Sequence, residues 1–167
     1  PDGEAGELIT RGPYTIRGYY DAAEKNTEAF TADGFYRMGD IVRRRGRYLY
    51  AEGRRKDFVN RGGEKISCEE IEALMLTHPK VKLAAVVAMP DPVFGEKACA
   101  FVVPNPGETL SFAELIAFLR AQQIAAFKLP ERLEVMPSFP VSPVGKILKR
   151  ELREIVVQRL DAEGKAT

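Results

Sequence analysis

From Ser67 onward, helix-like and strand-like patterns alternate in a fixed order. Ser67 and Glu70 have the spacing of a capping box, in which a hydroxyl and a carboxylate each accept a hydrogen bond from a free backbone N–H at a helix start. Apolar residues then recur at helical spacing until Pro79, which ends the helix. A second box, Ser111 with Glu114, predicts another helix start. Strands are predicted at 81–89, 98–103 and 131–136, and a last helix at 148–160. This order predicts a small α+β domain, a sheet with about three helices packed on it.

Residues 7–50 have a different pattern, made of short strand-like runs and turn signals. Two of these runs flank Arg45 and Gly46, which predicts a hairpin with the solvated arginines of RRRGR, 43–47, at its tip. Few apolar residues lie here, and no strong helix pattern is available to cover the strands. We therefore expect this region to be the edge of a larger structure.

Charge and cysteine spacing exclude several classes of protein. Twenty-five Lys and Arg against 24 Asp and Glu leave a net charge of +1, so the chain lacks the basic field typical of nucleic-acid binding. No apolar run is long enough to cross a bilayer, so we expect neither a nucleic-acid nor a membrane partner. Cys68 and Cys99 lack metal-ligand spacing, which predicts buried reduced thiols and no metal site.

A charged stretch joins the two patterned regions. GRRKDFVNRGGEKIS, residues 53–67, contains seven charged side chains and three glycines, and predicts a segment too poor in apolar residues to form a core. Its paired glycines, Gly62 and Gly63, permit positive φ or the close approach of another molecule to the backbone. A solvated linker, or a glycine turn that leads into the capped helix, is the alternative interpretation.

Three further residues have side chains suited to a nucleotide. Asp40, leaving a predicted strand, can accept two hydrogen bonds from ribose hydroxyls, although a Gly-Asp turn is an alternative. Arg54 can meet a ribose or phosphate oxygen. Lys146 lies in a Pro- and Gly-rich loop, where its charge can stabilise a developing phosphate or carboxylate anion, unless it is an ordinary surface lysine. No Ser/His/Asp triad can be assembled, and the single histidine, His78, is predicted to be structural.

Five segments in this order and spacing resemble the C-terminal part of adenylate-forming enzymes, the superfamily of acyl-CoA synthetases, luciferases and peptide-synthetase adenylation domains. They are YRMGD, GRRKDFVNRGGEKIS followed by EEIE, GEKACAFVV, IAAFKLPER and PVSPVGKILKREL. The resemblance extends to about Leu160. NRGGEKI, with Lys65, is most similar to the 2,3-dihydroxybenzoate or salicylate AMP ligases of siderophore pathways. GKILKREL is more similar to the ending common in CoA ligases, so a CoA ligase stays an open alternative.

The resemblance implies an activity and roles for individual residues. The parent enzyme would use ATP, with Mg²⁺, to convert a small aromatic carboxylic acid into an acyl adenylate in the cytoplasm. It would then transfer the acyl group to the phosphopantetheine thiol of an aryl carrier protein, or to CoA in the alternative. Asp40 would bind the ribose hydroxyls and Arg54 would assist at the nucleotide. Lys146 would lie near the reacting carboxylate and α-phosphate as the catalytic residue.

The resemblance also implies a domain organisation. Residues 1–55 would be the end of the large N-terminal adenylation domain, and 56–167 the mobile C-terminal domain. Lys56 would be the hinge, and the loop around Gly62 and Gly63 would line the thiol tunnel. The family's phosphate loop and acyl pocket would lie upstream of this chain, so the chain alone is expected to be inactive. A non-enzymatic module that docks a carrier protein is the alternative from another class.

Overall fold

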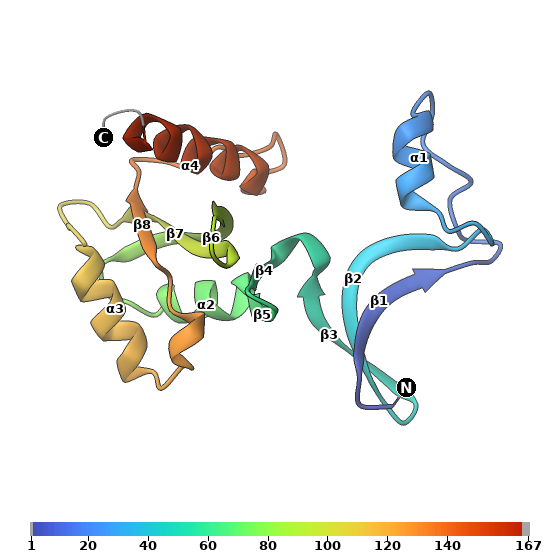
Figure 1. The fold of residues 1–167 in the computed structure, drawn as a ribbon, viewed down its shortest axis with the longest axis horizontal. Coiled ribbons are helices and arrows are strands. Elements are labelled where there is room, and N and C mark those ends of the chain that lie inside the picture. The colour runs from blue at the N-terminus through green and yellow to red at the C-terminus, as the bar shows by residue number, and fades with distance from the viewer. Residues whose placement is uncertain (1, 165–167) are drawn as a thin grey trace. The chain divides into compact units, whose positions relative to one another are not determined.

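A computed structural model of the chain describes residues 2–164 and divides into two compact units (Figure 1). The first unit ends at Lys56 and the second begins at Asp57, so the division lies one position beyond the predicted boundary at 55. The outer limits of the two predicted domains, residues 1 and 167, lie outside the described residues. Within 2–164, none of the helices has the length and apolar character that a membrane span requires.

The first unit is built on a three-stranded antiparallel sheet in the order β1-β2-β3. Its elements are β1 (Ala5–Thr10), α1 (Ala23–Ala29), β2 (Tyr36–Arg45), β3 (Tyr48–Arg54) and the 3₁₀ turn η1 (Arg55–Asp57), whose last residue begins the second unit. Arg45 pairs with Tyr48 across a tight turn in which Gly46 has a φ of +60°, so the predicted hairpin is confirmed. Among the described residues of this unit, none is buried.

Helix α1 was not predicted, and its sequence explains why. It has seven residues, no buried side chain and no side-chain cap at its N-terminus. Its position is set by Asn26, which accepts a hydrogen bond from the Tyr19 backbone N–H at 2.7 Å and donates one to the Tyr19 carbonyl at 2.9 Å. A helix that is held by Asn26 and by Lys25 over the Tyr19 ring, with no buried residue, leaves no apolar periodicity in the sequence.

The second unit is an α+β domain, as predicted. Its five-stranded sheet runs in the order β5-β4-β7-β6, and β8 pairs in parallel with β7. The strands are β4 (Phe58–Arg61), β5 (Glu64–Ser67), β6 (Val81–Asp91), β7 (Gly95–Pro104) and β8 (Arg132–Val135). The helices are α2 (Cys68–Met75), α3 (Phe112–Ala121) and α4 (Lys149–Gly164), with the 3₁₀ turn η2 (Ala126–Lys128).

Helices cover both faces of this sheet, with α4 on one face and α2 and α3 on the other (Figure 1). Successive residues of β6 therefore enter different cores. Ala84 and Val86 join the cluster that contains α2 and α3, whereas Ala85 and Val87 join the cluster that contains α4. The fully buried helix residues are Ile71, Met75, Leu115 and Leu119 in the first cluster and Leu152 and Val156 in the second.

Both predicted capping boxes are confirmed in their hydroxyl half. The Ser67 and Ser111 hydroxyls accept hydrogen bonds from the backbone N–H three residues later, at 3.4 Å and 3.2 Å. The carboxylates, however, bind lysines of other segments. Glu70 accepts from Lys128 of η2 at 2.7 Å, and the second carboxylate binds Lys80 at 2.7 Å. The two glutamates thus link segments that are distant in the sequence.

The prediction that residues 53–67 are too poor in apolar residues to form a core is wrong for their second half. Strands β4 and β5 form a hairpin in which Val59 and Ile66 are opposite each other and 0% exposed. The turn residues Gly62 and Gly63 have φ of +58° and +99°, which a two-residue hairpin turn of type I′ requires. Each strand has four residues and one buried apolar position, so its alternation is too short to be recognised.

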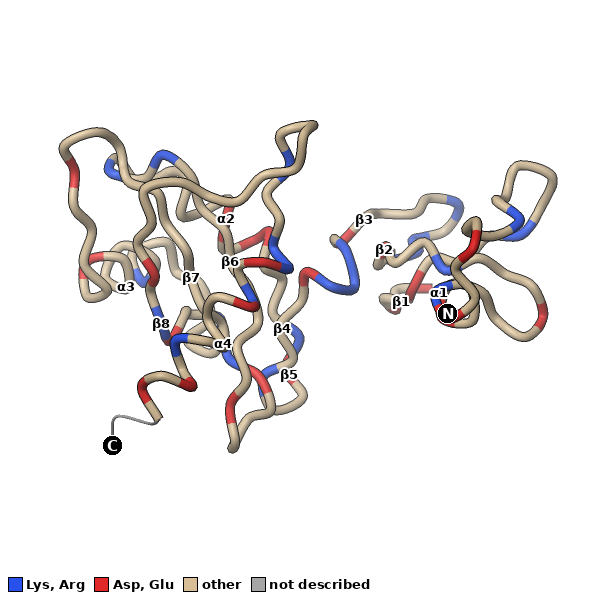
Figure 2. The backbone as a smooth tube through the Cα atoms, turned by 90° about the horizontal axis from the view of Figure 1, so that it is seen from above, with Lys and Arg blue, Asp and Glu red and all other residues tan. Residues whose placement is uncertain are grey.

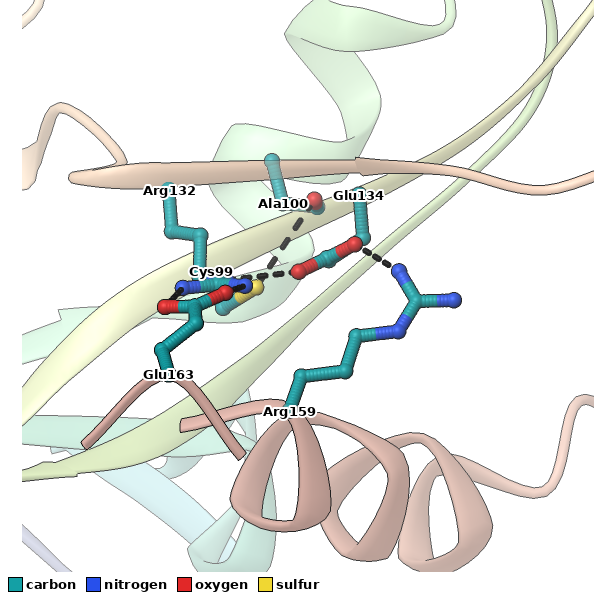
Figure 3. A network of polar contacts seen from close by, with 6 residues as sticks. All are labelled: Cys99, Ala100, Arg132, Glu134, Arg159 and Glu163. Atoms are coloured by element: carbon teal, nitrogen blue, oxygen red, sulfur yellow. Dashed lines mark hydrogen bonds and ion pairs between the residues drawn. The ribbon is translucent and has the colours of Figure 1, made fainter. Parts of the chain in front are cut away.

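Besides the two glutamate–lysine pairs of the capping boxes, an ionic network joins β8 to the C-terminal part of α4 (Figure 3). Glu134 is buried, accepts a hydrogen bond from Arg132 Nε at 2.6 Å and pairs with Arg159. Arg132 also binds both carboxylate oxygens of Glu163, at 2.8 Å and 2.6 Å. Beside them Cys99 is a buried free thiol, as predicted, and burial raises the pKa of Cys99 to about 12.

Candidate functional site

Asp40 and Arg54 lie directly opposite each other on β2 and β3. Arg54 Nε is 3.2 Å from Asp40 Oδ1, and the Arg54 side chain remains 69% exposed. A β-bulge between Ile41 and Val42 follows the pair in the strand. Bulges redirect side chains at the edges of sheets and beside binding sites. The structure thus brings together the two residues that the sequence assigns to the nucleotide, with an acceptor and a donor both open to solvent.

Two tyrosines extend this polar surface. The hydroxyls of Tyr19 and Tyr36 are 3.0 Å apart, and the hydrogen bond between them is the main cause of a raised pKa at Tyr36. The charges of Arg54 and Asp40 also act on Tyr36. Sequence reasoning missed Tyr36, four positions before Asp40, because the pairing of β2 with β1 shifts between Arg37 and Ile41 and simple alternation does not hold there. Hydroxyls, a carboxylate and a guanidinium together suit a ribose or another hydroxyl-rich ligand.

Lys146 lies in a loop that is closed by its own backbone. The Ser142 N–H donates to the Lys146 carbonyl at 2.8 Å, and the Gly145 N–H donates to the Ser142 carbonyl at 2.8 Å. The Ser142 hydroxyl accepts from the Lys146 N–H at 3.2 Å, and Gly145 has a φ of +79°. Lys146 is exposed, three residues before α4 begins. The loop therefore presents one ammonium group from a defined backbone, while the role of Lys146 stays a prediction.

The glycine turn between β4 and β5 is anchored to the turn between β6 and β7. The Gly62 N–H donates to the Phe94 carbonyl at 2.8 Å, and a Cβ at Gly62 would lie 3.1 Å from the Phe94 ring. Arg61 stacks on that ring at 3.9 Å and binds the Glu131 carboxylate at 3.0 Å. A Cβ at Gly63 would meet no atom within 4 Å. The Phe94 ring thus leaves little room for a side chain at Gly62, whereas the space beside the Gly63 backbone is open.

The boundary between the units is a run of charge, drawn as a blue segment between β3 and β4 in Figure 2. Arg54 and the first two residues of η1 supply the positive charges, and Lys56 is the last residue of the first unit. The next residue, Asp57, has its Oδ1 3.7 Å from Lys149 Nζ and 3.6 Å from Arg153 Nη2. Elsewhere in both units Figure 2 shows acidic and basic residues interspersed. The hinge role of Lys56 stays a prediction.

The predicted site residues are divided between the units. Asp40 and Arg54 belong to the first unit, and Lys146, Gly62 and Gly63 to the second. Within residues 2–164, no three His, Cys, Asp or Glu side chains are grouped so as to hold a metal ion.

Comparison with known proteins decides the family. Residues 70–146 match the AMP-binding enzyme C-terminal domain. Over 159 residues the chain is 54% identical to the 2,3-dihydroxybenzoate-AMP ligase of Bacillus subtilis. The match covers 95% of this chain and 29% of the relative. Residues 70–146 thus belong to the C-terminal domain of AMP-binding enzymes, and the chain as a whole is similar to adenylate-forming enzymes. The matched domain begins in α2 and ends at Lys146, so it includes most of the second unit.

Two further proteins support this likeness. A Streptomyces protein described as salicylyl-CoA synthase / salicylate adenylyltransferase is 53% identical, with 97% of this chain and 30% of the relative covered. The chain also matches the crystal structure of ATP-bound MatB from Rhodopseudomonas palustris, with 34% sequence identity and a TM-score of 0.80. The match covers 93% of this chain and 31% of the MatB chain. The chain thus spans less than a third of the proteins it matches. The resemblance and the α+β fold class predicted from the sequence are confirmed.

Proposed function

We propose that this chain is the C-terminal part of an ATP-dependent aryl-acid AMP ligase of siderophore synthesis. The enzyme would activate 2,3-dihydroxybenzoate or salicylate as the acyl adenylate and transfer the aryl group to the phosphopantetheine thiol of an aryl carrier protein. The observation that carries this proposal is the 54% identity, along nearly the whole chain, to a 2,3-dihydroxybenzoate-AMP ligase.

The first step would depend on both units. An oxygen of the aryl carboxylate attacks the α-phosphorus of ATP, the bond to the bridging oxygen of the β-phosphate breaks, and pyrophosphate leaves. Asp40 would accept hydrogen bonds from the ribose hydroxyls, with Arg54 beside it at the nucleotide. Lys146 would supply positive charge where negative charge develops on the carboxylate and phosphate oxygens. Mg²⁺ would enter with the phosphates, as is usual for this ion.

In the second step the thiol sulfur attacks the aryl carbonyl carbon, and AMP leaves with the bonding electrons. The glycine turn at Gly62 and Gly63 would line the approach of the phosphopantetheine arm. The open space beside Gly63 supports this role, because a backbone without a side chain permits close approach of a narrow ligand. Lys56 would be the hinge at which the second unit turns between the two steps.

The first unit would be the end of the large N-terminal domain. This proposal is supported by its burial pattern, since none of its described residues is buried and Tyr14 and Tyr20 are both 100% exposed. A sheet of three strands needs a covered apolar face to be stable. The remainder of the large domain would provide that cover, together with the acyl pocket and phosphate loop. The chain alone is accordingly proposed to be inactive.

The test is ATP–pyrophosphate exchange by the full-length protein, with 2,3-dihydroxybenzoate, salicylate, benzoate, a fatty acid and amino acids as substrates. Exchange restricted to the hydroxybenzoates is the expected result. Exchange with a different acid would contradict the proposed substrate, and exchange with none would contradict the activity.

A substitution tests the role of Lys146. Lys146→Ala should reduce adenylation by about 10²-fold or more, in the range seen when one stabilising group is removed from a transition state. Thioester formation from supplied acyl adenylate should change little. Lys82→Ala, which removes an exposed lysine of the same unit, is the matched control. Equal loss of both half-reactions in Lys146→Ala would show that the lysine is not specific to adenylation.

A CoA ligase is the second candidate, and two observations favour it. The relative from Streptomyces carries both a CoA synthase and an adenylyltransferase description. The segment GKILKREL, 145–152, is also similar to the ending of CoA ligases. The acceptor distinguishes the candidates: the aryl adenylate should be consumed by a phosphopantetheine-loaded carrier protein in the first case and by free CoA in the second.

A further inference from the structure

Lys149 is the first residue of α4 and has an environment unlike that of Lys146, three residues earlier. Its Nζ lies 2.8 Å and 3.1 Å from the two carboxylate oxygens of Glu72 in α2. The Lys149 side chain is 18% exposed and that of Glu72 is 15% exposed. This pair is therefore a largely desolvated contact between two helices that pack on opposite faces of the sheet.

The carboxylate of Glu72 is also bound to the sheet, because it accepts a hydrogen bond from the backbone N–H of Val86 in β6. Burial raises the pKa of Glu72, and the hydrogen bonds from Lys149 and Val86 oppose that rise. Burial alone would lower the pKa of Lys149, but its hydrogen bond to Glu72 and the charge of Asp57 outweigh burial and raise it. Lys149 therefore carries its charge at neutral pH.

The same lysine reaches the start of the unit. Asp57, the first residue of the second unit, lies between Lys149 and Arg153, at 3.7 Å and 3.6 Å. Lys149 and Arg153 are one turn apart in α4, so both project from the same face of the helix. The anchor network, defined as Asp57, Glu72, Lys149 and Arg153, thus joins the start of the unit to α2, β6 and the first turn of α4.

The Lys146 loop is continuous with this first turn. The Leu148 N–H donates to the Pro140 carbonyl at 2.9 Å, and Val141 pairs with Ile147, so the base of the loop is closed immediately before Lys149. A displacement of the first turn of α4 would carry the whole loop with it.

We propose that Lys149 is a positioning residue for Lys146: by binding Glu72 and Asp57 together, it holds the lysine loop at a fixed position relative to the residue that follows the hinge. This inference rests on the proposed function. A rigid-body rotation at Lys56 delivers Lys146 to the reacting atoms only if the loop keeps a constant geometry relative to the pivot. Misplacement by about 1 Å can reduce a rate 10²-fold.

A purely structural role explains the anchor network less well. The central part of α4 is held by Leu152 and Val156, both 0% exposed, and its C-terminal part by the network around Glu134. Buried ion pairs add little net stability compared with apolar contacts, because both charges lose their hydration. Charged groups with defined hydrogen-bond geometry instead favour one arrangement of the helix over others.

The experiment compares half-reactions in the full-length protein. Lys149→Met keeps much of the side-chain volume and removes the charge. We expect the kcat of adenylation to fall about 10-fold to 100-fold with the KM values for ATP and acid nearly unchanged, as for a misplaced catalytic group. Thioester formation from supplied acyl adenylate should stay within about twofold of the wild type. Lys149→Arg, which can still bind both carboxylates, should restore most of the adenylation rate.

Lys128→Met is the matched control. Lys128 binds Glu70, which lies in α2 as Glu72 does, at 2.7 Å, but this pair connects α2 to η2 rather than to α4. It should change neither half-reaction. If Lys149→Met does not fold, Asp57→Asn provides the test with a nearly isosteric change, and a fall in adenylation alone is again expected.

Three results would overturn the inference: no change in adenylation, an equal loss in both half-reactions, or the same loss in Lys128→Met. Each of these requires a wild-type protein that catalyses exchange. Absence of exchange with every acid in the wild type would instead contradict the proposed function itself, and with it the positioning role.

Discussion

Both units contain paired strands, but their interiors are very different. The first has strands of up to ten residues, with β2 paired to both β1 and β3, yet none of its described residues is buried. The second has three strands of only four residues beside its long ones, yet Val59 in β4 and Ile66 in β5 are 0% exposed. Backbone pairing alone therefore does not make a stable domain, because stability requires apolar surface removed from water on at least one face of the sheet.

The side chains of the first unit show the same contrast. Its ion pairs, such as Arg37 with Glu7 and Arg54 with Asp40, lie at the surface, where such pairs contribute about 0–1 kcal/mol. Several of its large apolar side chains are exposed, including Tyr48 and Leu49 beside the hairpin turn. In the second unit the ionic networks lie beside helices that have fully buried apolar residues. There they favour one arrangement of helices and strands that apolar contacts already hold together.

The largest expected effect concerns the units in isolation. Residues 57–164 should fold as a cooperative domain, because that segment contains every buried residue in the described part of the chain. Residues 1–56 should be largely unfolded, since their sheet has no covered face. Far-UV circular dichroism and amide hydrogen exchange on the separate pieces measure this difference. A cooperative thermal transition in residues 1–56 would contradict the comparison.

A core substitution should separate the units within one chain. Phe101 in β7 is 0% exposed, and Phe101→Ala should destabilise the second unit by about 3–5 kcal/mol, through lost burial and a residual cavity. The matched change Phe35→Ala, at a half-buried aromatic of the first unit, should leave the unfolding transition of the second unit unchanged. Urea unfolding followed by circular dichroism provides the measurement. A similar shift from both variants would mean that the two units unfold as one.

Substitutions at two glycines of the second unit test how much room its turns leave for a side chain. Gly62→Ala and Gly107→Ala both place a side chain at positive φ, which disfavours an alanine by about 1–2 kcal/mol. Gly62→Ala should be worse by about 1 kcal/mol, because its new Cβ would lie 3.1 Å from the Phe94 ring, whereas Gly107 has no neighbour within 4 Å. The midpoints of urea unfolding compare the two variants. Equal midpoints would show that the contact with Phe94 yields freely.

The smallest effect is a pH dependence at the same end of the sheet. The hydrogen bonds from Lys97 and from the Phe94 and Val93 N–H groups lower the pKa of Asp91 from 3.8 to about 2. The folded state therefore binds the proton of the Asp91 carboxyl group less tightly than the unfolded state does. The stabilisation of the fold by the ionised carboxylate is complete above pH 3.8 and is lost as the pH falls to about 2. Asp91→Asn should flatten the loss of stability with acid in this window. Asp161→Asn, at an exposed carboxylate of α4, should leave it unchanged.

Much of the second unit was predictable, because its signals are local. The Ser67 and Ser111 hydroxyls cap helices within three residues of themselves, and long strands such as β6 form apolar runs long enough to be recognised. The predictions failed where a local signal was short or shared. Helix α1 has no apolar face, and the glutamates of both capping boxes bind lysines from other segments instead of returning to the helix start.

The sequence by itself determined the α+β order of the second unit, the hairpin of β2 and β3, and the Pro- and Gly-rich loop that presents Lys146. Each depends on residues within a few positions of one another, so periodicity, capping and turn chemistry suffice. Only the tertiary structure decided that Val59 and Ile66 are core residues, that Asp40 lies against Arg54, and that Lys149 binds a glutamate 77 positions away. Those contacts depend on which strands and helices meet in space, and no pattern within one segment specifies its distant partner.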